Sequence, residues 1–207
     1  MLINVEIFHD VERPKQPTKE VYEGLAKIES IIGRLVLIND SRKMKITKPG
    51  DLTVDTEKIN WPKMPANISI VLTNRLLISG ATGANMHGIA FQGRDVVLIN
   101  TNHPEITPQV TAHEFAHLLE ILEQYDDRHC PLTDCIMYST ALSNETRERV
   151  DTSTGYKRLK NRLGHPVINS QLIEYGIDFC DGCRSEIAEN THRLMARMAL
   201  KTMSSLT

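Results

Sequence analysis

The stretch His113-Glu114-Phe115-Ala116-His117 decides how the rest of the sequence is interpreted. Residues four positions apart lie on the same face of a helix, so His113 and His117 can direct two imidazoles to one metal ion. Glu114 follows the first histidine directly and can accept the proton of a water molecule that zinc polarises. A pattern with three fixed positions also arises by chance, so the flanking sequence has to support it. On a helix, the stretch predicts a catalytic zinc site with Glu114 as general base.

The flanking sequence does predict a helix here. Thr107-Pro108 is typical of a helix start, because the hydroxyl can cap the helix and the proline occupies a position whose N–H has no partner anyway. No glycine or proline follows before Tyr125, so we expect the helix to continue towards Tyr125. Before it, residues 88–91 and 96–100 predict two strands, and Gly93 suits the hairpin turn between them.

The apolar pattern of the remaining sequence predicts further strands and two more helices. Strands are expected at residues 3–8, 34–38, 43–47 and 68–72. One helix is expected from Thr18, as its cap, to Gly33, and a terminal helix at residues 186–203. Residues 48–65, which contain three of the nine prolines and the single tryptophan, predict a loop. The chain is therefore expected to form one α+β domain.

The spacing does not settle the third zinc ligand. In metzincins a glycine turns the chain after the helix, and a third histidine follows six residues after the second. Here Glu120 stands in the place of the glycine, and His129 comes twelve residues after His117. A helix of the expected length carries the chain about 12 Å beyond His117, and the four residues after it span roughly 13–14 Å when extended. We therefore expect His129 as the third ligand, with Asp126 or Asp127 as alternatives.

The cysteines occur as two close pairs, Cys130 with Cys135 and Cys180 with Cys183. Without an export signal they should stay reduced, and reduced cysteines in close pairs are more often metal ligands than disulfides. Four thiolates suit a closed tetrahedral zinc site with a structural role. Such a site would clamp the segment after the histidine helix to the C-terminal part of the chain. Four unrelated buried thiols are the alternative.

The order of these motifs resembles the archaemetzincin family of zinc metallopeptidases. The match runs from His113 to Cys183 and begins with the histidine helix. It continues with His129 directly followed by Cys130, then with the run Cys135-Ile136-Met137, and it closes with the C-x-x-C pair. The combined order is specific, although no single piece is. The missing turn glycine and a longer spacer at residues 138–179 depart from the family pattern; the spacer could form a lid or a partner-binding insertion.

The resemblance implies a metzincin-like mixed twisted sheet, an active-site helix and a smaller C-terminal helical part clamped by a four-cysteine zinc site. Residues 1–125 would form an upper subdomain with the sheet and the active-site helix. Residues 126–207 would form a lower subdomain with the Met-turn, the cysteine site and the C-terminal helix. Two zinc ions are implied, one catalytic on His113, His117 and His129, and one structural on Cys130, Cys135, Cys180 and Cys183, with Met137 in the Met-turn.

These features predict a metalloprotease, a hydrolase that cleaves peptide bonds in a peptide or protein substrate. The substrate would pair with a strand at residues 88–92. The alternative is a catalytically inactive zinc protein of the same fold that acts as a binding module, because the third-ligand segment is altered. A zinc deaminase is disfavoured, since its signature places glutamate two residues after a histidine and proline before C-x-x-C. Here Glu114 directly follows His113, and Phe179 precedes Cys180.

Charge and hydropathy limit the partners and the location. The net charge of -2 gives no basic excess of the kind that a surface for nucleic acid or anionic membrane requires. Residues 1–6 lack the basic start and long apolar core of a secretory signal. No apolar run approaches the ~20 residues needed to cross a bilayer. We therefore expect a soluble cytoplasmic protein that binds neither nucleic acid nor membrane.

Overall fold

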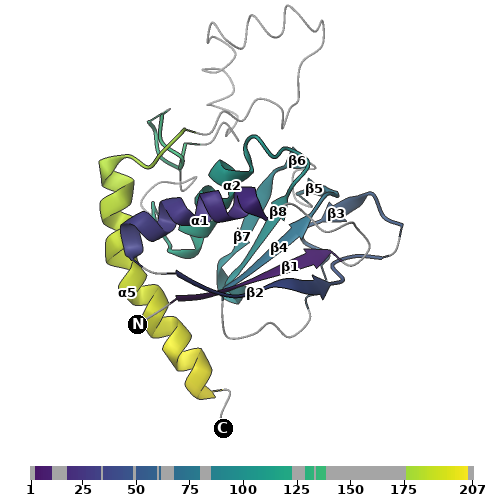
Figure 1. Cartoon of the computed structure of the whole chain (residues 1–207), viewed down its shortest axis with the longest axis horizontal. Helices are drawn as coiled ribbons and strands as arrows, with labels where there is room; N and C mark the ends of the chain where they lie inside the picture. The colour runs from purple at the N-terminus through teal and green to yellow at the C-terminus, as the bar shows by residue number, and fades with distance from the viewer. Residues whose placement is uncertain are drawn as a thin grey trace, which may run out of the picture.

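The computed structural model of the chain shows a mixed sheet with its helices packed mainly on one side (Figure 1). The structure describes residues 3–10, 18–33, 35–48, 50–59, 61, 68–79, 85–122, 129–132, 134–138 and 176–204.

The main sheet has five strands in the order β2-β1-β4-β8-β7. The strands are β1 (Ile3–Asp10), β2 (Leu35–Met44), β4 (Ile68–Thr73), β7 (Gly88–Phe91) and β8 (Val96–Asn100). β1 runs parallel to β2 and β4, and β4 runs parallel to β8, whereas β7 is antiparallel to β8 and lies at the edge. The central strands β4 and β8 are buried along their whole length, as expected where both faces of a parallel sheet are covered.

Alternate side chains of these strands enter two separate cores, because successive residues of a strand point to opposite faces. In β8, for example, Val97 and Ile99 lie in the larger core and Val96 and Leu98 in the smaller one. The larger core also contains side chains of the helices α1 (Lys19–Ile32), α2 (Thr107–Leu118) and α5 (Asp181–Ser204). The sheet thus provides the platform on which α2, the histidine helix, is held.

A smaller sheet is joined to the main one by a buried ion pair. Arg75 donates from Nε to Oδ2 of Asp10 at 2.6 Å, and the two side chains are 1% and 0% exposed. The same guanidinium donates to the carbonyl oxygens of Lys48, at 3.3 Å, and of Asp51. The smaller sheet has the strand order β3-β5-β6, with β3 (Thr53–Asp55), β5 (Leu76–Ile78) and β6 (Asn85–Met86).

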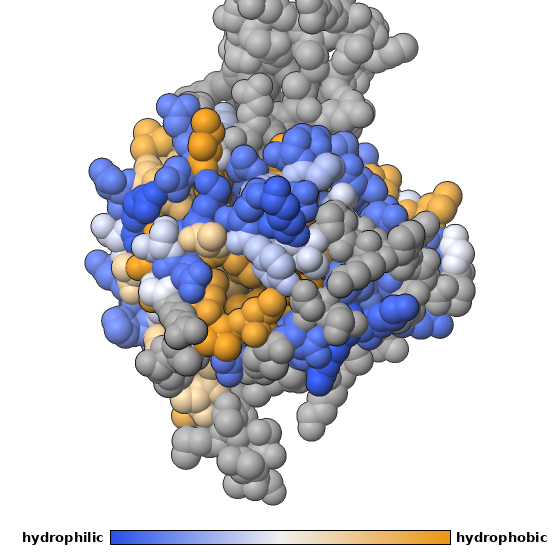
Figure 2. Space-filling view, viewed as in Figure 1, coloured by the Kyte–Doolittle hydropathy of each residue, from blue (hydrophilic) through white to orange (hydrophobic). Residues whose placement is uncertain are grey.

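Helix α5 lies along one side of the molecule and packs against α1 (Figure 1). Its 24 residues give it a length of about 36 Å. Ile187, Leu194 and Met198 bury its inner face in the larger core. Polar side chains cover most of the face shown in Figure 2, and apolar ones reach the surface mainly near its centre. Within the described ranges, no helix combines the length and the apolar character needed to cross a membrane.

The structure confirms the α+β class and the mixed sheet and corrects several boundaries. The two short strands expected at residues 34–38 and 43–47 are one strand, β2, which follows β1 through two register shifts. Residues 48–65, expected as a loop, contain β3. The terminal helix begins at Asp181, five residues earlier than expected.

The expected caps also differ from those observed. Thr18 lies at the cap position of α1, but its side chain makes no capping hydrogen bond. Ile106, and not Thr107, is the cap residue of α2; Thr107 begins the helix, and its hydroxyl donates to the carbonyl of His103 at 2.8 Å. Between β7 and β8, Gln92–Arg94 form a 3-10 turn, and Asp95 adopts the left-handed conformation (φ 54°) that a glycine was expected to supply.

Candidate metal and catalytic site

Three imidazoles converge beside α2. The ligand nitrogens of His113, His117 and His129 all lie within 4.8 Å of one another. The Nε2 atoms of His113 and His117 are 3.1 Å apart. A tetrahedral zinc ion with Zn–N distances of about 2.0–2.1 Å separates its ligand nitrogens by about 3.3–3.4 Å. The spacing and the chemistry of the three donors therefore fit one zinc ion.

His113 is oriented by a backbone carbonyl. Its Nδ1 lies 2.8 Å from the carbonyl oxygen of Ile136 and donates to it. This contact places the proton on Nδ1, so the lone pair of Nε2 is the one that would bind metal. It corresponds to the outer hydrogen bond that metal-binding histidines usually make. Burial, together with the charge of neighbouring His129, lowers the pKa of His113 to about 3. The imidazole is therefore held neutral, which is the form that binds metal.

The carboxylate of Glu114 lies between α2 and the edge strand β7. Glu114 is only 7% exposed, and this burial raises its pKa to about 8, while the backbone N–H of Ala90 donates to it and acts in the opposite direction. A backbone group of β7 thus fixes the carboxyl group of the residue that directly follows His113. Glu114 is the one acidic side chain of the H-E-x-x-H stretch, and it lies in contact with the edge strand.

Gly88 makes the close approach of β7 to α2 possible. A Cβ at this position would lie 2.7 Å from Cγ of Glu114 and 2.8 Å from Cγ1 of Val110. Both distances are shorter than a carbon–carbon contact allows, since such atoms normally stay about 3.5–4.0 Å apart. Any larger residue at 88 would therefore push β7 and Glu114 apart.

Helix α2 ends at Leu118, so its expected continuation to Tyr125 is wrong. The N–H of Glu120 bonds back to the carbonyl of His117 at 3.1 Å, and Glu120 turns left-handed with φ 56°. Gln92 donates from Nε2 to the same carbonyl at 2.7 Å and thereby caps the helix end. The chain thus turns at the position of the missing glycine. Tyr125 itself, and the alternative ligands Asp126 and Asp127, lie outside the described residues.

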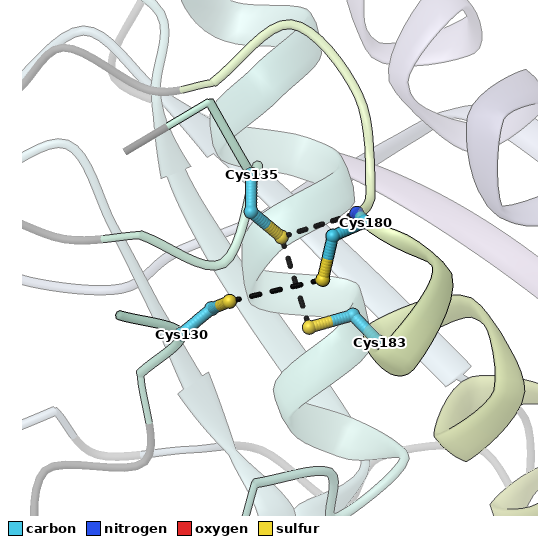
Figure 3. A group of neighbouring side chains, drawn as sticks. All are labelled: Cys130, Cys135, Cys180 and Cys183. Carbon is cyan, nitrogen blue, oxygen red and sulfur yellow. Dashed lines mark hydrogen bonds between the residues drawn. The ribbon is translucent and has the colours of Figure 1, made fainter. Parts of the chain in front are cut away.

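The four cysteine sulfurs form a second cluster (Figure 3). Sγ of Cys130 lies 3.8 Å from Sγ of Cys180, and Sγ of Cys135 lies 3.7 Å from Sγ of Cys183. Disulfide sulfurs are about 2.05 Å apart, so these thiols are free. A tetrahedral zinc ion with Zn–S distances of about 2.3 Å separates its sulfurs by about 3.8 Å. The cluster therefore has the dimensions of a four-thiolate zinc site.

The cysteine cluster joins a loop to the start of α5. Cys183 lies in the first turn of α5, and Cys180, just before it, donates its backbone N–H to Sγ of Cys135 at 3.4 Å. The thiol of Cys183 lowers the pKa of Cys135 to about 5, and the pKa of Cys183 is raised in return. The thiolate is the metal-binding form of cysteine, so this pairing favours metal binding at Cys135.

The turn around Met137 lies between the two clusters. Met137 is fully buried in the larger core, and its carbonyl accepts the N–H of Cys130 at 2.9 Å. Its neighbour Ile136 supplies the carbonyl that orients His113. Tyr138 is half-buried, and residues 139–175 of the spacer lie outside the described part of the chain. One turn thus contacts both groups of ligands.

Some groups that shape the site carry no recognisable signal in the sequence. The carbonyl of Ile136 and the N–H of Ala90 are backbone groups; every residue supplies a carbonyl, and every residue except proline an N–H. Gly88 and Gln92 belonged to the expected edge strand, but nothing in their spacing indicates contact with α2. Their roles depend on pairing between segments far apart in sequence.

No protein-family model matches the sequence, and no curated protein matches it. Among solved structures, the archaemetzincin of Methanopyrus kandleri is similar over 92% of this chain and 96% of its own length, with 13% sequence identity and a TM-score of 0.57. The archaemetzincin of Archaeoglobus fulgidus, complexed with malonate, is similar over 89% of this chain and 99% of its own, with 14% identity and a TM-score of 0.48. The likeness to the first structure covers nearly all of both chains and confirms the resemblance that the motif order from His113 to Cys183 indicated. The chain therefore has the archaemetzincin fold.

Proposed function

We propose that the chain is a zinc-dependent metallopeptidase that hydrolyses peptide bonds with Glu114 as general base. The observation that carries the proposal is the position of the Glu114 carboxylate. It belongs to the residue directly after His113, and the N–H of Ala90 in β7 donates to it. The group proposed as proton acceptor therefore belongs to the same helix as two of the three imidazoles and contacts the edge strand.

In this proposal His113, His117 and His129 hold the catalytic ion. Zinc bound there would supply a Lewis acid for the attacking water and for the scissile carbonyl. Glu114 takes the proton of the water and passes it to the leaving amine. The hydrogen bond from Nδ1 of His113 to Ile136 keeps the ring in position during the reaction.

The substrate in this proposal is an extended peptide or protein segment that pairs with residues 88–92. β7 is the last strand on its side of the main sheet, within the part of the chain that the structure describes. An edge strand offers backbone groups to an added strand, and such pairing does not depend on the sequence of the substrate. The absence of a basic excess is consistent with a peptide rather than a nucleic-acid substrate.

We also propose that the chain is one metallopeptidase domain with an upper part, residues 1–125, and a lower part, residues 126–207. Support comes from the larger core, which contains side chains of both parts, including Ile70, Phe115, Ile136 and Ile187. The structural ion would be held by the four cysteines of the lower part. A cytoplasmic location is proposed because free thiols in this arrangement persist in reducing compartments.

The alternative of an inactive binding module was motivated by the altered third-ligand segment. Despite that alteration, His129 lies with the other two histidines, so all three possible ligands are present, which argues against the inactive module. The two proposals differ in a simple assay, in which the zinc-loaded protein is incubated with a peptide library with and without a chelator. Cleavage that disappears with the chelator and returns with added zinc supports the peptidase. A protein that holds zinc in the histidine cluster and cleaves no peptide would favour the binding module.

A further inference from the structure

The turn that follows α2 contains residues whose side chains disfavour the backbone conformation that the turn requires. Glu120 and Leu122 both adopt the left-handed conformation, with φ of 56° and 61°. In the left-handed conformation the Cβ of an L-residue lies too close to its own backbone, so glycine is the residue that usually adopts it. A strained conformation of this kind persists only when the surrounding structure holds it.

Helix α5 supplies groups that hold this turn. Asn190 donates from Nδ2 to the carbonyl oxygen of Glu120 at 3.0 Å. The N–H of Leu122 donates to Oε1 of Glu186 at 2.7 Å. Each left-handed residue therefore has a backbone group fixed by a side chain of α5. Asn190 is only 6% exposed, so its hydrogen bond is protected from competition by water.

Arg197 makes a third connection from α5 to the same region. It forms an ion pair with the carboxylate of Glu120 and another with Asp95, whose Oδ1 is 2.9 Å from Nη2. Its Nη2 also donates to the carbonyl of Leu118, at the end of α2, at 3.1 Å. Asp95 lies in the turn before β8, so one guanidinium joins the end of the histidine helix to the hairpin of the edge strand.

These contacts come from one face of one helix that is fixed at its start. Glu186, Asn190 and Arg197 are separated by four and seven residues, a spacing that places side chains on the same face. The first turn of α5 carries Cys183, which belongs to the cysteine cluster. The groups that hold the turn are therefore attached to the part of the chain that the cysteine site fixes.

We propose that Asn190, Glu186 and Arg197 are positioning residues that replace the missing turn glycine and set the path of the chain towards His129. This inference rests on the proposed metal site of the three histidines. Its specific consequence is that the contacts from α5 are needed because residue 120 is not glycine. Replacing Glu120 with glycine removes the strain at residue 120, although not that at Leu122. It should therefore make the hydrogen bond of Asn190 to the carbonyl of residue 120 largely dispensable for metal binding.

The test is a cobalt titration of the histidine site in protein whose cysteine site is already loaded with zinc. Asn190→Ala should weaken cobalt binding to the histidines by roughly tenfold, because it frees the turn that leads towards His129; a loss of this size is the lower end of what removing a direct partner of a metal ligand causes. Glu189→Ala, at an exposed position one residue away, is the matched control and should leave the affinity unchanged. In the Glu120→Gly background the same Asn190→Ala change should weaken binding by about twofold at most.

Zinc retained by the cysteines, together with an unchanged far-ultraviolet circular dichroism spectrum, verifies that each variant is folded. If Asn190→Ala does not fold, Asn190→Ser replaces it, with Glu189→Ser as control, and the same pattern is expected. Equal losses of affinity with and without the Glu120→Gly substitution would overturn the inference and leave the proposed metal site intact. Failure of the unmodified protein to bind cobalt at the histidines would overturn the proposed function and this inference with it.

Discussion

Nδ1 of His113 lies 2.8 Å from the carbonyl oxygen of Ile136, and this hydrogen bond connects the histidine helix to the turn around Met137. The N–H of Ile136 is bonded in turn to the carbonyl of Asp178 at 2.9 Å, two residues before Cys180. Two hydrogen bonds and the short segment from Asp178 to Cys180 thus connect His113 to the cysteine cluster. The orientation of His113 therefore depends on how the C-terminal part of the chain is folded.

Metal content should distinguish the two sites. Protein purified without added metal should contain two equivalents of zinc, and His113→Ala should reduce this to about one because a two-histidine site binds zinc weakly. Elemental analysis measures both values. Cys183→Ala should also lower the zinc content and, unlike His113→Ala, should lower the melting temperature strongly, since a structural site contributes folding free energy. A content of one equivalent that does not change in His113→Ala would contradict the assignment of the histidine site.

Glu114→Gln should abolish turnover and retain metal. Glutamine has nearly the same shape and can still accept the N–H of Ala90, but it cannot take a proton. We expect kcat to fall by roughly 10²–10⁴-fold, the usual contribution of a general base. The measurement is peptide cleavage at matched zinc content. Glu105→Gln, at an exposed glutamate before α2, is the control and should cleave like the unmodified protein.

Gly88→Ala should damage both stability and catalysis. The added methyl group would lie 2.7 Å from Cγ of Glu114, so β7 and α2 have to separate. We expect a loss of about 1–3 kcal/mol in the free energy of unfolding, as is typical of overpacking. Urea unfolding and peptide cleavage report the two effects. Gly93→Ala provides a matched control on the same hairpin, because its Cβ would have no atom within 4 Å; similar losses in both variants would show that contact with Glu114 is not the cause.

Asp10→Ala should destabilise the protein without a direct effect on the metal sites. It leaves the fully buried guanidinium of Arg75 without its carboxylate, and breaking a buried pair in this way costs roughly 3–5 kcal/mol. The hydrogen bond from the hydroxyl of Thr73 to the same carboxylate is lost as well. Urea unfolding gives the free energy, and elemental analysis of the folded fraction checks the zinc. Asp55→Ala removes an exposed pair with Lys58 and should leave the unfolding midpoint unchanged.

The members of each pair of possible metal ligands could be predicted from the sequence, because they depend on side-chain identity and short spacing. His113 and His117 are one helical turn apart, and each cysteine pair lies within a single loop or turn. Local geometry therefore brings these ligands together whatever the rest of the fold does. Which residue completes the histidine set could not be derived in the same way, because His129 approaches through a turn that local spacing does not determine.

The end of α2 was predicted wrongly for a physical reason. Residues 119–125 contain neither glycine nor proline, so nothing local opposes the helix. The groups that fix the turn, Asn190 and Arg197, are 70 and 77 residues away from Glu120. Tertiary contacts of this range override propensity. The hairpin shows the same effect, since Asp95, paired with Arg197, takes the left-handed conformation that was expected of Gly93.

His129 and Cys130 are consecutive residues that belong to different clusters. Their Cα atoms are separated by one peptide unit, about 3.8 Å, so an ion held by the cysteines also confines the third histidine. The connection between Leu122 and His129 then spans two anchored ends, and its closure entropy grows only with the logarithm of its length, about 0.6 kcal/mol for each doubling. A chain anchored in this way tolerates insertions between its second and third histidines at small cost. The longer spacing in this sequence is therefore compatible with a complete three-histidine site.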